Sequence, residues 1–190
     1  MPPPRDMASP GFIMSLIGNA YFETFKPGQK YVHRRGRTMT QYDNLRWTFA
    51  TLNTAQAHWN TEALKDYFGG AFEKPIMNGA IVIAAVAGLT SEDVAQNCCA
   101  EMKLGKITMT MAVFPGDTLW ATSEILETAD VPDRPDAGLV TYAVTARNQR
   151  EQVVCSFERT VLVKRAAHWL ERDAQFEQNK FCSGLNPEGG

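Results

Sequence analysis

The 190-residue sequence lacks the features that mark several functional classes. Its 19 lysines and arginines are balanced by 21 aspartates and glutamates, so no basic surface for nucleic acid is expected. It has no apolar run long enough to cross a bilayer. The first residues, MPPPRD, do not have the charged and then apolar pattern of a secretory signal peptide. We therefore expect a cytoplasmic protein that binds neither nucleic acid nor membrane.

Cysteine and histidine are also scarce. The four cysteines show no zinc-ligand spacing, so no metal site is predicted and reduced, buried or inert thiols are expected: Cys98, Cys99, Cys155 and Cys182. No motif in the chain implies a cofactor. Histidine is the side chain best suited to proton transfer near neutral pH, and the chain offers only three: His33, His58 and His168. We expect His33, in a charged strand, and His168, near the C-terminus, not to be catalytic.

The pattern of apolar residues predicts an α+β fold. An unbroken apolar stretch over residues 80–89 predicts a buried helix that begins at Gly79. A capped short helix is expected after residue 40, another around residues 62–67, and a solvated extension at residues 91–93. Alternating apolar and polar residues predict strands at 30–34, 106–113, 118–126, 139–148 and 153–164. A long buried helix followed by a run of antiparallel strands is an α+β order.

This organisation predicts one domain with two extensions. Apolar residues make up 44% of the chain, which is enough for a sizeable core. Residues 21–165 are expected to form the domain. Residues 1–20 read as an irregular N-terminal arm, and residues 166–190 as a C-terminal extension with a helix near 169–178.

Two short segments carry the chemistry: TLNTAQAH at residues 51–58 and KPIMNG at residues 74–79. His58 lies among polar side chains in an otherwise apolar region. Gly79 begins the buried helix, where backbone N–H groups are exposed at the positive end of the helix dipole. A proton-transfer residue and an oxyanion-binding helix start are the two parts needed for chemistry beside a thioester carbonyl.

This pattern resembles the MaoC-like, R-specific enoyl-CoA hydratases and dehydratases over residues 21–165. In that family a D-x-N-x-x-H loop carries a catalytic aspartate and histidine, and a later helix begins H-G. His58 and Gly79 match the histidine and the glycine, whereas Asn53 replaces the aspartate and Asn78 replaces the residue before the glycine. The form N-T-x-x-x-H, together with residues 35–44 and 154–163, resembles the branch that acts on mesaconyl-, itaconyl- or methylmalyl-CoA.

The resemblance implies a hot-dog fold, in which an antiparallel sheet wraps a long central helix. It implies a homodimer or higher homo-oligomer and a substrate that is an acyl-CoA or acyl-carrier-protein thioester. His58 would then be the acid/base, the Gly79 N–H would bind the thioester oxygen, and Asn53 would orient water or the thioester. Three residues are expected to contact the acyl group, the arginines through a second carboxylate: Asn78, Arg37 and Arg46.

Each residue also has a structural interpretation. His58 could hold its loop, Asn53 could stabilise the same loop through its amide, and Gly79 could allow a close helix–sheet approach. Asp43 is expected to cap a helix rather than act in catalysis.

Two other functions stay open. One is a hot-dog thioesterase, which usually relies on a carboxylate to activate water. The buried helix has no Asp or Glu before Glu92, which counts against this function. The other is a non-catalytic thioester-binding or scaffold subunit whose site has degenerated at position 53.

Overall fold

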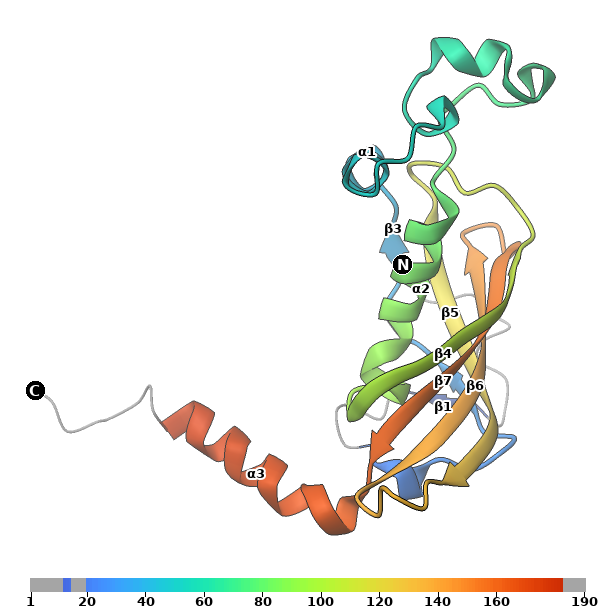
Figure 1. The fold of residues 1–190 in the computed structure, drawn as a ribbon. Helices are drawn as coiled ribbons and strands as arrows, with labels where there is room; N and C mark the ends of the chain where they lie inside the picture. Colours follow the sequence, from blue (N-terminus) through green and yellow to red (C-terminus); the bar gives the residue numbers. More distant parts are fainter. Residues whose placement is uncertain (1–11, 15–19, 183–190) are drawn as a thin grey trace, which may run out of the picture.

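The computed structural model describes residues 12–14 and 20–182 (Figure 1). Its α-helices are α1 (Gln41–Ala50), α2 (Gly79–Val94) and α3 (Ala166–Cys182). Its strands are β1 (Phe12–Met14), β2 (Lys30–Val32), β3 (Arg37–Thr38), β4 (Cys98–Met109), β5 (Thr118–Asp130), β6 (Ala137–Asn148) and β7 (Val153–Lys164). Short 3₁₀ turns complete the described chain: η2 (Phe22–Thr24), η3 (Gln56–His58), η4 (Glu62–Lys65) and η5 (Tyr67–Gly70).

The strands form one sheet in the order β1-β2-β5-β6-β7-β4, and β3 also pairs with β5. The long strands are antiparallel, and β1 alone among the described strands runs parallel to its neighbour. The sheet curves around α2, which lies along one face (Figure 1). This is the arrangement expected of a hot-dog domain.

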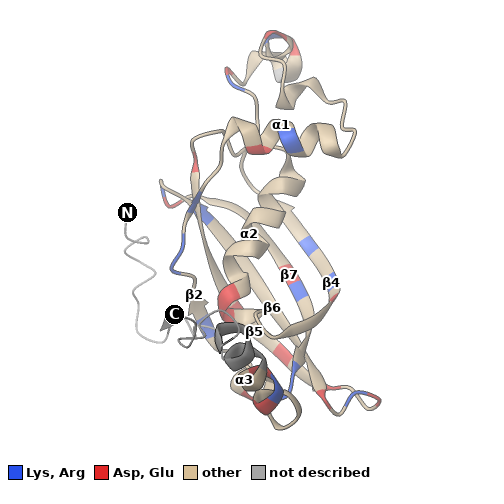
Figure 2. Cartoon of the chain, turned by 90° about the vertical axis from the view of Figure 1, so that its left-hand side faces the viewer, with Lys and Arg blue, Asp and Glu red and all other residues tan. Residues whose placement is uncertain are grey.

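The core lies between α2 and the inner face of the sheet. The apolar side of α2 contributes Val82, Val86 and Leu89, which are buried. Alternate residues of β6 and β7, such as Val144 and Phe157, face them. Each fully buried side chain of this size stabilises the fold by roughly 1.5–3 kcal/mol. Along α2 the charges occur only near its end (Figure 2).

The edge strand β4 differs from its expected position. It begins at Cys98 and ends at Met109, whereas residues 106–113 were expected. Three register shifts interrupt its pairing with β7, and its residues are exposed or only half-buried. Apolar and polar residues alternate along a strand only when one of its faces is buried. The sequence pattern therefore could not locate β4 correctly.

The end of α2 also differs from expectation. The helix continues to Val94, and Asp93, expected in a solvated extension, is buried. His33, which follows β2 and has charged neighbours in the sequence, is buried as well. Its Nδ1 lies 2.5 Å from Asp93 Oδ2, and its Nε2 lies 2.8 Å from Ser123 Oγ. These bonds satisfy buried polar groups and connect the last turn of α2 to the sheet.

The two extensions contain regular structure. Within the expected irregular arm, Phe12–Met14 form β1. At the other end α3 extends away from the sheet (Figure 1). Asp173 attaches its first half to the domain, because its carboxylate accepts hydrogen bonds from Lys164 Nζ at 2.8 Å and from the Tyr21 hydroxyl at 3.0 Å.

Two further findings concern membrane-spanning helices and cysteine thiols. Among the described helices, none is long and apolar enough to span a bilayer. Cys98, Cys99 and Cys155 are free thiols, and Cys155 is fully buried, as its strand pattern predicted. Burial raises the pKa of the Cys155 thiol to about 11.

Candidate active site

His58 is the last residue of η3, and two hydrogen bonds fix its place. Its ring Nδ1 lies 3.0 Å from the carbonyl oxygen of Ile76, and the Ile76 N–H donates to the Ala57 carbonyl at 3.1 Å. A carbonyl oxygen only accepts, so the pattern of bonds assigns the hydrogen of the neutral ring to Nδ1. The other nitrogen, Nε2, then carries a lone pair, and it has no partner among the described residues. His58 is therefore oriented to accept a proton at Nε2.

Gly79 is the first residue of α2. The side chain of the N-cap residue Asn78 accepts a hydrogen bond from the Ala80 N–H at 3.0 Å. The Gly79 N–H has no acceptor within the described part of the chain, as is typical of the first turn of a helix. This leaves a backbone donor at the positive end of the α2 dipole.

His58 and Gly79 line the same pocket, which has a volume of about 510 Å³. Val82 of α2 and residues 109–113, at and after the end of β4, form much of the remaining wall. A β-carbon at Gly79 would lie 3.8 Å from Met109 Cε, an ordinary van der Waals distance. Close packing is therefore not the reason for a glycine at this position. Access to its backbone N–H is the better explanation for the glycine.

A residue that sequence reasoning missed connects the two halves of the pocket. Asn44 of α1 is fully buried. Its Nδ2 donates to the carbonyl oxygens of His58 at 2.8 Å and Ile76 at 3.0 Å. Its Oδ1 accepts from the backbone N–H of Asn78 at 2.9 Å. One side chain thus positions both the His58 loop and the start of α2.

The signal for Asn44 was its place on α1. The buried residues of this helix are Asn44 and Thr48, one turn apart, whereas Phe49 is exposed. The buried side of α1 is therefore polar rather than apolar. A polar residue buried inside a helix face indicates specific hydrogen-bond partners.

Asp43 caps α1, as predicted. Thr40 and Asp43 form a reciprocal capping box. Partial burial opposes ionisation of Asp43, but hydrogen bonds from Thr40 and the nearby Arg37 guanidinium outweigh it, so the pKa of Asp43 is lower than usual. Arg37 Nη2 lies 2.8 Å from Asp43 Oδ1. Arg37 is therefore occupied in an ion pair.

Four other predicted site residues do not line the pocket. Asn53 Oδ1 accepts a hydrogen bond from the Ala55 N–H at 2.8 Å, which shapes the loop before His58. Asn78 caps α2. Arg37 is paired with Asp43, and Arg46 is exposed on α1. Of the six predicted residues, the structure brings His58 and Gly79 together.

Within residues 12–14 and 20–182, no group of three or more His, Cys, Asp or Glu side chains is placed to hold a metal ion. The pocket thus presents one imidazole, one free backbone donor and a largely apolar wall. Such a site suits a carbonyl compound whose oxygen gains negative charge while a proton moves nearby.

Comparison with known proteins identifies the family. A sequence profile of the mesaconyl-CoA hydratase family matches residues 17–181. The chain belongs to this family. It is 26% identical over 146 residues to the mesaconyl-CoA hydratase of Haloarcula marismortui, with 76% of this chain and 40% of that protein covered. It is 25% identical over 178 residues to the beta-methylmalyl-CoA dehydratase of Chloroflexus aurantiacus, with coverage of 85% and 49%. The chain spans less than half the length of these relatives.

Solved structures confirm the hot-dog fold. A monoamine oxidase regulatory protein from Archaeoglobus is 25% identical with a TM-score of 0.68, over 79% of this chain and 99% of that one. A MaoC domain protein from Chloroflexus aurantiacus, described as a dehydratase, is 27% identical with a TM-score of 0.70, covering 77% and 40%. A Mycobacterium tuberculosis protein with a double hot-dog fold is 18% identical, covers 80% and 46%, and has a TM-score of 0.70.

Proposed function

We propose that this chain adds water to, or removes it from, the α,β bond of an enoyl thioester. The observation that carries the proposal is that His58 and Gly79 line one pocket, and that neither the ring Nε2 of His58 nor the N–H of Gly79 has a partner among the described residues. Membership of the mesaconyl-CoA hydratase family supports it, because the named relatives are a hydratase and a dehydratase of CoA thioesters.

In the hydration direction, His58 Nε2 takes a proton from water while the water oxygen bonds to the β-carbon. The electron pair of the C=C bond moves through the α-carbon onto the thioester oxygen. The Gly79 N–H, with the α2 dipole behind it, stabilises that enolate. The protonated imidazole then returns its proton to the α-carbon, so OH and H have been added across the bond. Dehydration is the reverse sequence.

This proposal gives His58 the whole acid/base role. An amide such as Asn53 does not exchange protons near neutral pH, and its oxygen already accepts the Ala55 N–H. We therefore propose that Asn53 shapes the His58 loop and that Asn78 caps α2. Arg37 and Arg46 have no part in the proposal, because neither lines the pocket.

We also propose that two copies of the chain pair along β4. This strand forms one edge of the described sheet. The strand and the residues just after it leave several large apolar side chains at least 40% exposed: Met102, Leu104, Ile107, Met109 and Met111. Long, apolar sheet edges of this kind are usually covered. The same segment, residues 109–113, walls the pocket, so a partner at β4 would help to enclose it. Relatives about twice as long, and a double hot-dog neighbour, support pairing of two such units.

The division into residues 1–20, 21–165 and 166–190, and a cytoplasmic location, belong to the same proposal. The sheet body from β2 to β7 falls within 21–165, which supports that boundary.

The deciding experiment is incubation of the purified protein with crotonyl-, mesaconyl-, itaconyl- and 3-hydroxyacyl-CoA, followed by mass spectrometry. Gain or loss of one water by any of them supports the proposal. Release of free CoA thiol without hydration identifies the thioesterase alternative. Binding without any turnover identifies the scaffold alternative.

A further inference from the structure

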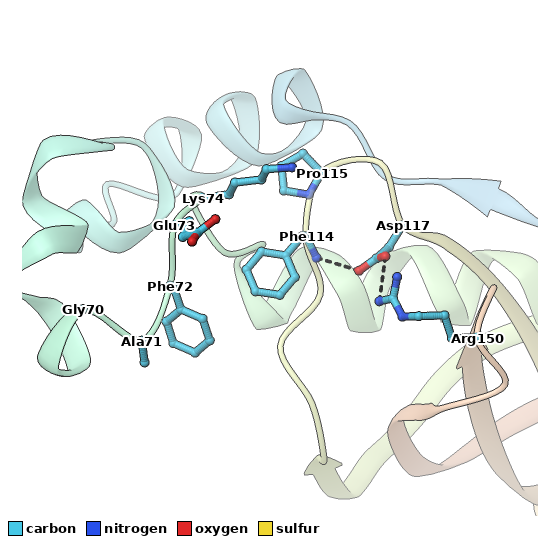
Figure 3. Close-up of a pocket in the computed structure, with 9 residues that line it drawn as sticks. All are labelled: Gly70, Ala71, Phe72, Glu73, Lys74, Phe114, Pro115, Asp117 and Arg150. Carbon is cyan, nitrogen blue, oxygen red and sulfur yellow. Dashed lines mark hydrogen bonds and ion pairs between the residues drawn. The ribbon is translucent and has the colours of Figure 1, made fainter.

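A second pocket has a volume of about 480 Å³, and Figure 3 shows the residues that line it. Residues 70–74 and 114–117 form most of its wall, with Arg150 on the far side. The same two chain segments continue into the first pocket, and the Met77 N–H donates to the Val113 carbonyl between them at 2.8 Å. Lys74 and Gly79 are five positions apart in the sequence, so their Cα atoms are at most about 18 Å apart. The two pockets are therefore neighbours along one pair of segments.

Aromatic rings form one part of this pocket. The phenyl rings of Phe72 and Phe114 lie 5.8 Å apart, centroid to centroid, at 56° to each other. Figure 3 shows them side by side, with Arg150 beyond Phe114. Such rings offer apolar faces against which a planar base stacks.

The pocket has four charged side chains. Asp117 and Arg150 form an ion pair, whereas Glu73 and Lys74 have no charged partner among the described residues. Buried Asp117 accepts from the Phe114 N–H at 3.0 Å, from Gln149 Nε2 at 2.7 Å and from Arg150 Nη2 at 3.1 Å. These bonds use the carboxylate and hold Arg150, whose side chain is 54% exposed, at the rim. Lys74 and Glu73 are both exposed.

We propose that this pocket binds the nucleotide end of coenzyme A. The adenine ring would stack on Phe72 and Phe114, and its amino group would donate to Glu73. The phosphate oxygens would accept from Lys74 and Arg150. A simple anion would be repelled here by the carboxylate of Glu73. A nucleotide would use all three kinds of group: the aromatic rings for its base, the carboxylate for its amino group, and the cations for its phosphates.

This inference rests on the proposed function and names the carrier of its acyl group. A carrier protein presents its acyl chain on phosphopantetheine and has no nucleotide to place in the pocket. Coenzyme A has the same pantetheine arm with a nucleotide at its end, so it would occupy both neighbouring pockets at once. The chain would then prefer CoA thioesters to carrier-protein thioesters.

Calorimetry with free CoA tests the site independently of any reaction. We expect Lys74→Ala and Phe72→Ala each to weaken CoA binding by roughly three- to tenfold, since each removes one contact. Pantetheine, which lacks the nucleotide, should bind both variants as it binds the wild type. Lys26→Ala, a change at an exposed lysine in the turn before β2, is the matched control and should leave CoA binding unchanged. Circular dichroism should show intact folding in all three.

Kinetics provide the second arm. If hydration is observed, kcat/KM should fall in Lys74→Ala for an enoyl-CoA and stay unchanged for the same acyl group on N-acetylcysteamine. An equal fall for both substrates, equal CoA affinity in wild type and variants, or no binding of CoA by the wild type would overturn the assignment. Absence of hydration with CoA binding weakened by the variants would reject the proposed function and support the nucleotide pocket.

Discussion

Asn44 and His58 are joined by a hydrogen bond of 2.8 Å from the buried carboxamide of one to the backbone carbonyl of the other. The same carboxamide contacts Ile76, whose carbonyl oxygen also lies 3.0 Å from His58 Nδ1. The orientation of the proposed acid/base thus depends on a side chain of a different helix.

Replacement of Asn44 by Asp should disable the site. The carboxylate keeps an acceptor for the Asn78 N–H but directs negative charge at two carbonyl oxygens in a buried position. We expect a loss of stability of about 2–4 kcal/mol and a larger proportional loss of kcat than of substrate affinity. Thermal unfolding and steady-state kinetics measure the two effects. Tyr42→Phe, on the exposed side of α1, is the control, and a wild-type melting temperature in Asn44→Asp would contradict the prediction.

His58→Ala should reduce kcat on the best substrate by roughly a hundredfold or more, in line with the usual contribution of a general acid/base. The ring makes one hydrogen bond to the protein, so the folded state should be retained. Quenched assays read by mass spectrometry measure the rate, and circular dichroism shows whether the variant is folded. Wild-type rates in the variant would show that the histidine is structural and would favour the scaffold alternative.

Two substitutions at Asn53 distinguish a structural role of this residue from a catalytic one. An aspartate keeps the oxygen that accepts the Ala55 N–H, so Asn53→Asp should fold normally and keep or raise activity on simple enoyl-CoAs. Asn53→Ala removes the acceptor and should cost about 1 kcal/mol of stability. Chemical denaturation and rates on crotonyl-CoA compare the two variants. An inactive Asn53→Asp with normal stability would assign the amide a direct part in catalysis.

If two copies of the chain pair along β4, a charge at one of its apolar positions should disrupt the dimer. Leu104→Glu should convert a dimer into a monomer in light scattering at micromolar concentration, because it places a charge where two apolar edges meet. Leu126→Glu, at a similarly exposed position on β5, should leave the mass unchanged. A wild-type protein that is already monomeric would reject the proposed assembly.

The parts of the fold that sequence could predict are those with local patterns. The start of α2 at Gly79 follows from an Asn-Gly step before an apolar run, and β7 has the bounds that alternation predicted. Asn44 could not be found in this way, because its partners lie 14, 32 and 34 residues away along the chain. The same holds for His33 and Asp93, which are 60 residues apart. Contacts of this kind depend on the assembled sheet.

The helix α2 is held at both ends by buried polar groups: Asn44 through Asn78 at its start, and His33 through Asp93 at its last turn. A helix fixed in this way has little freedom to slide or tilt against the sheet. In the proposed reaction, the Gly79 N–H would then keep one position throughout. The helix dipole would already be oriented when the protein has folded, so the reaction would require little rearrangement of the protein around the developing negative charge.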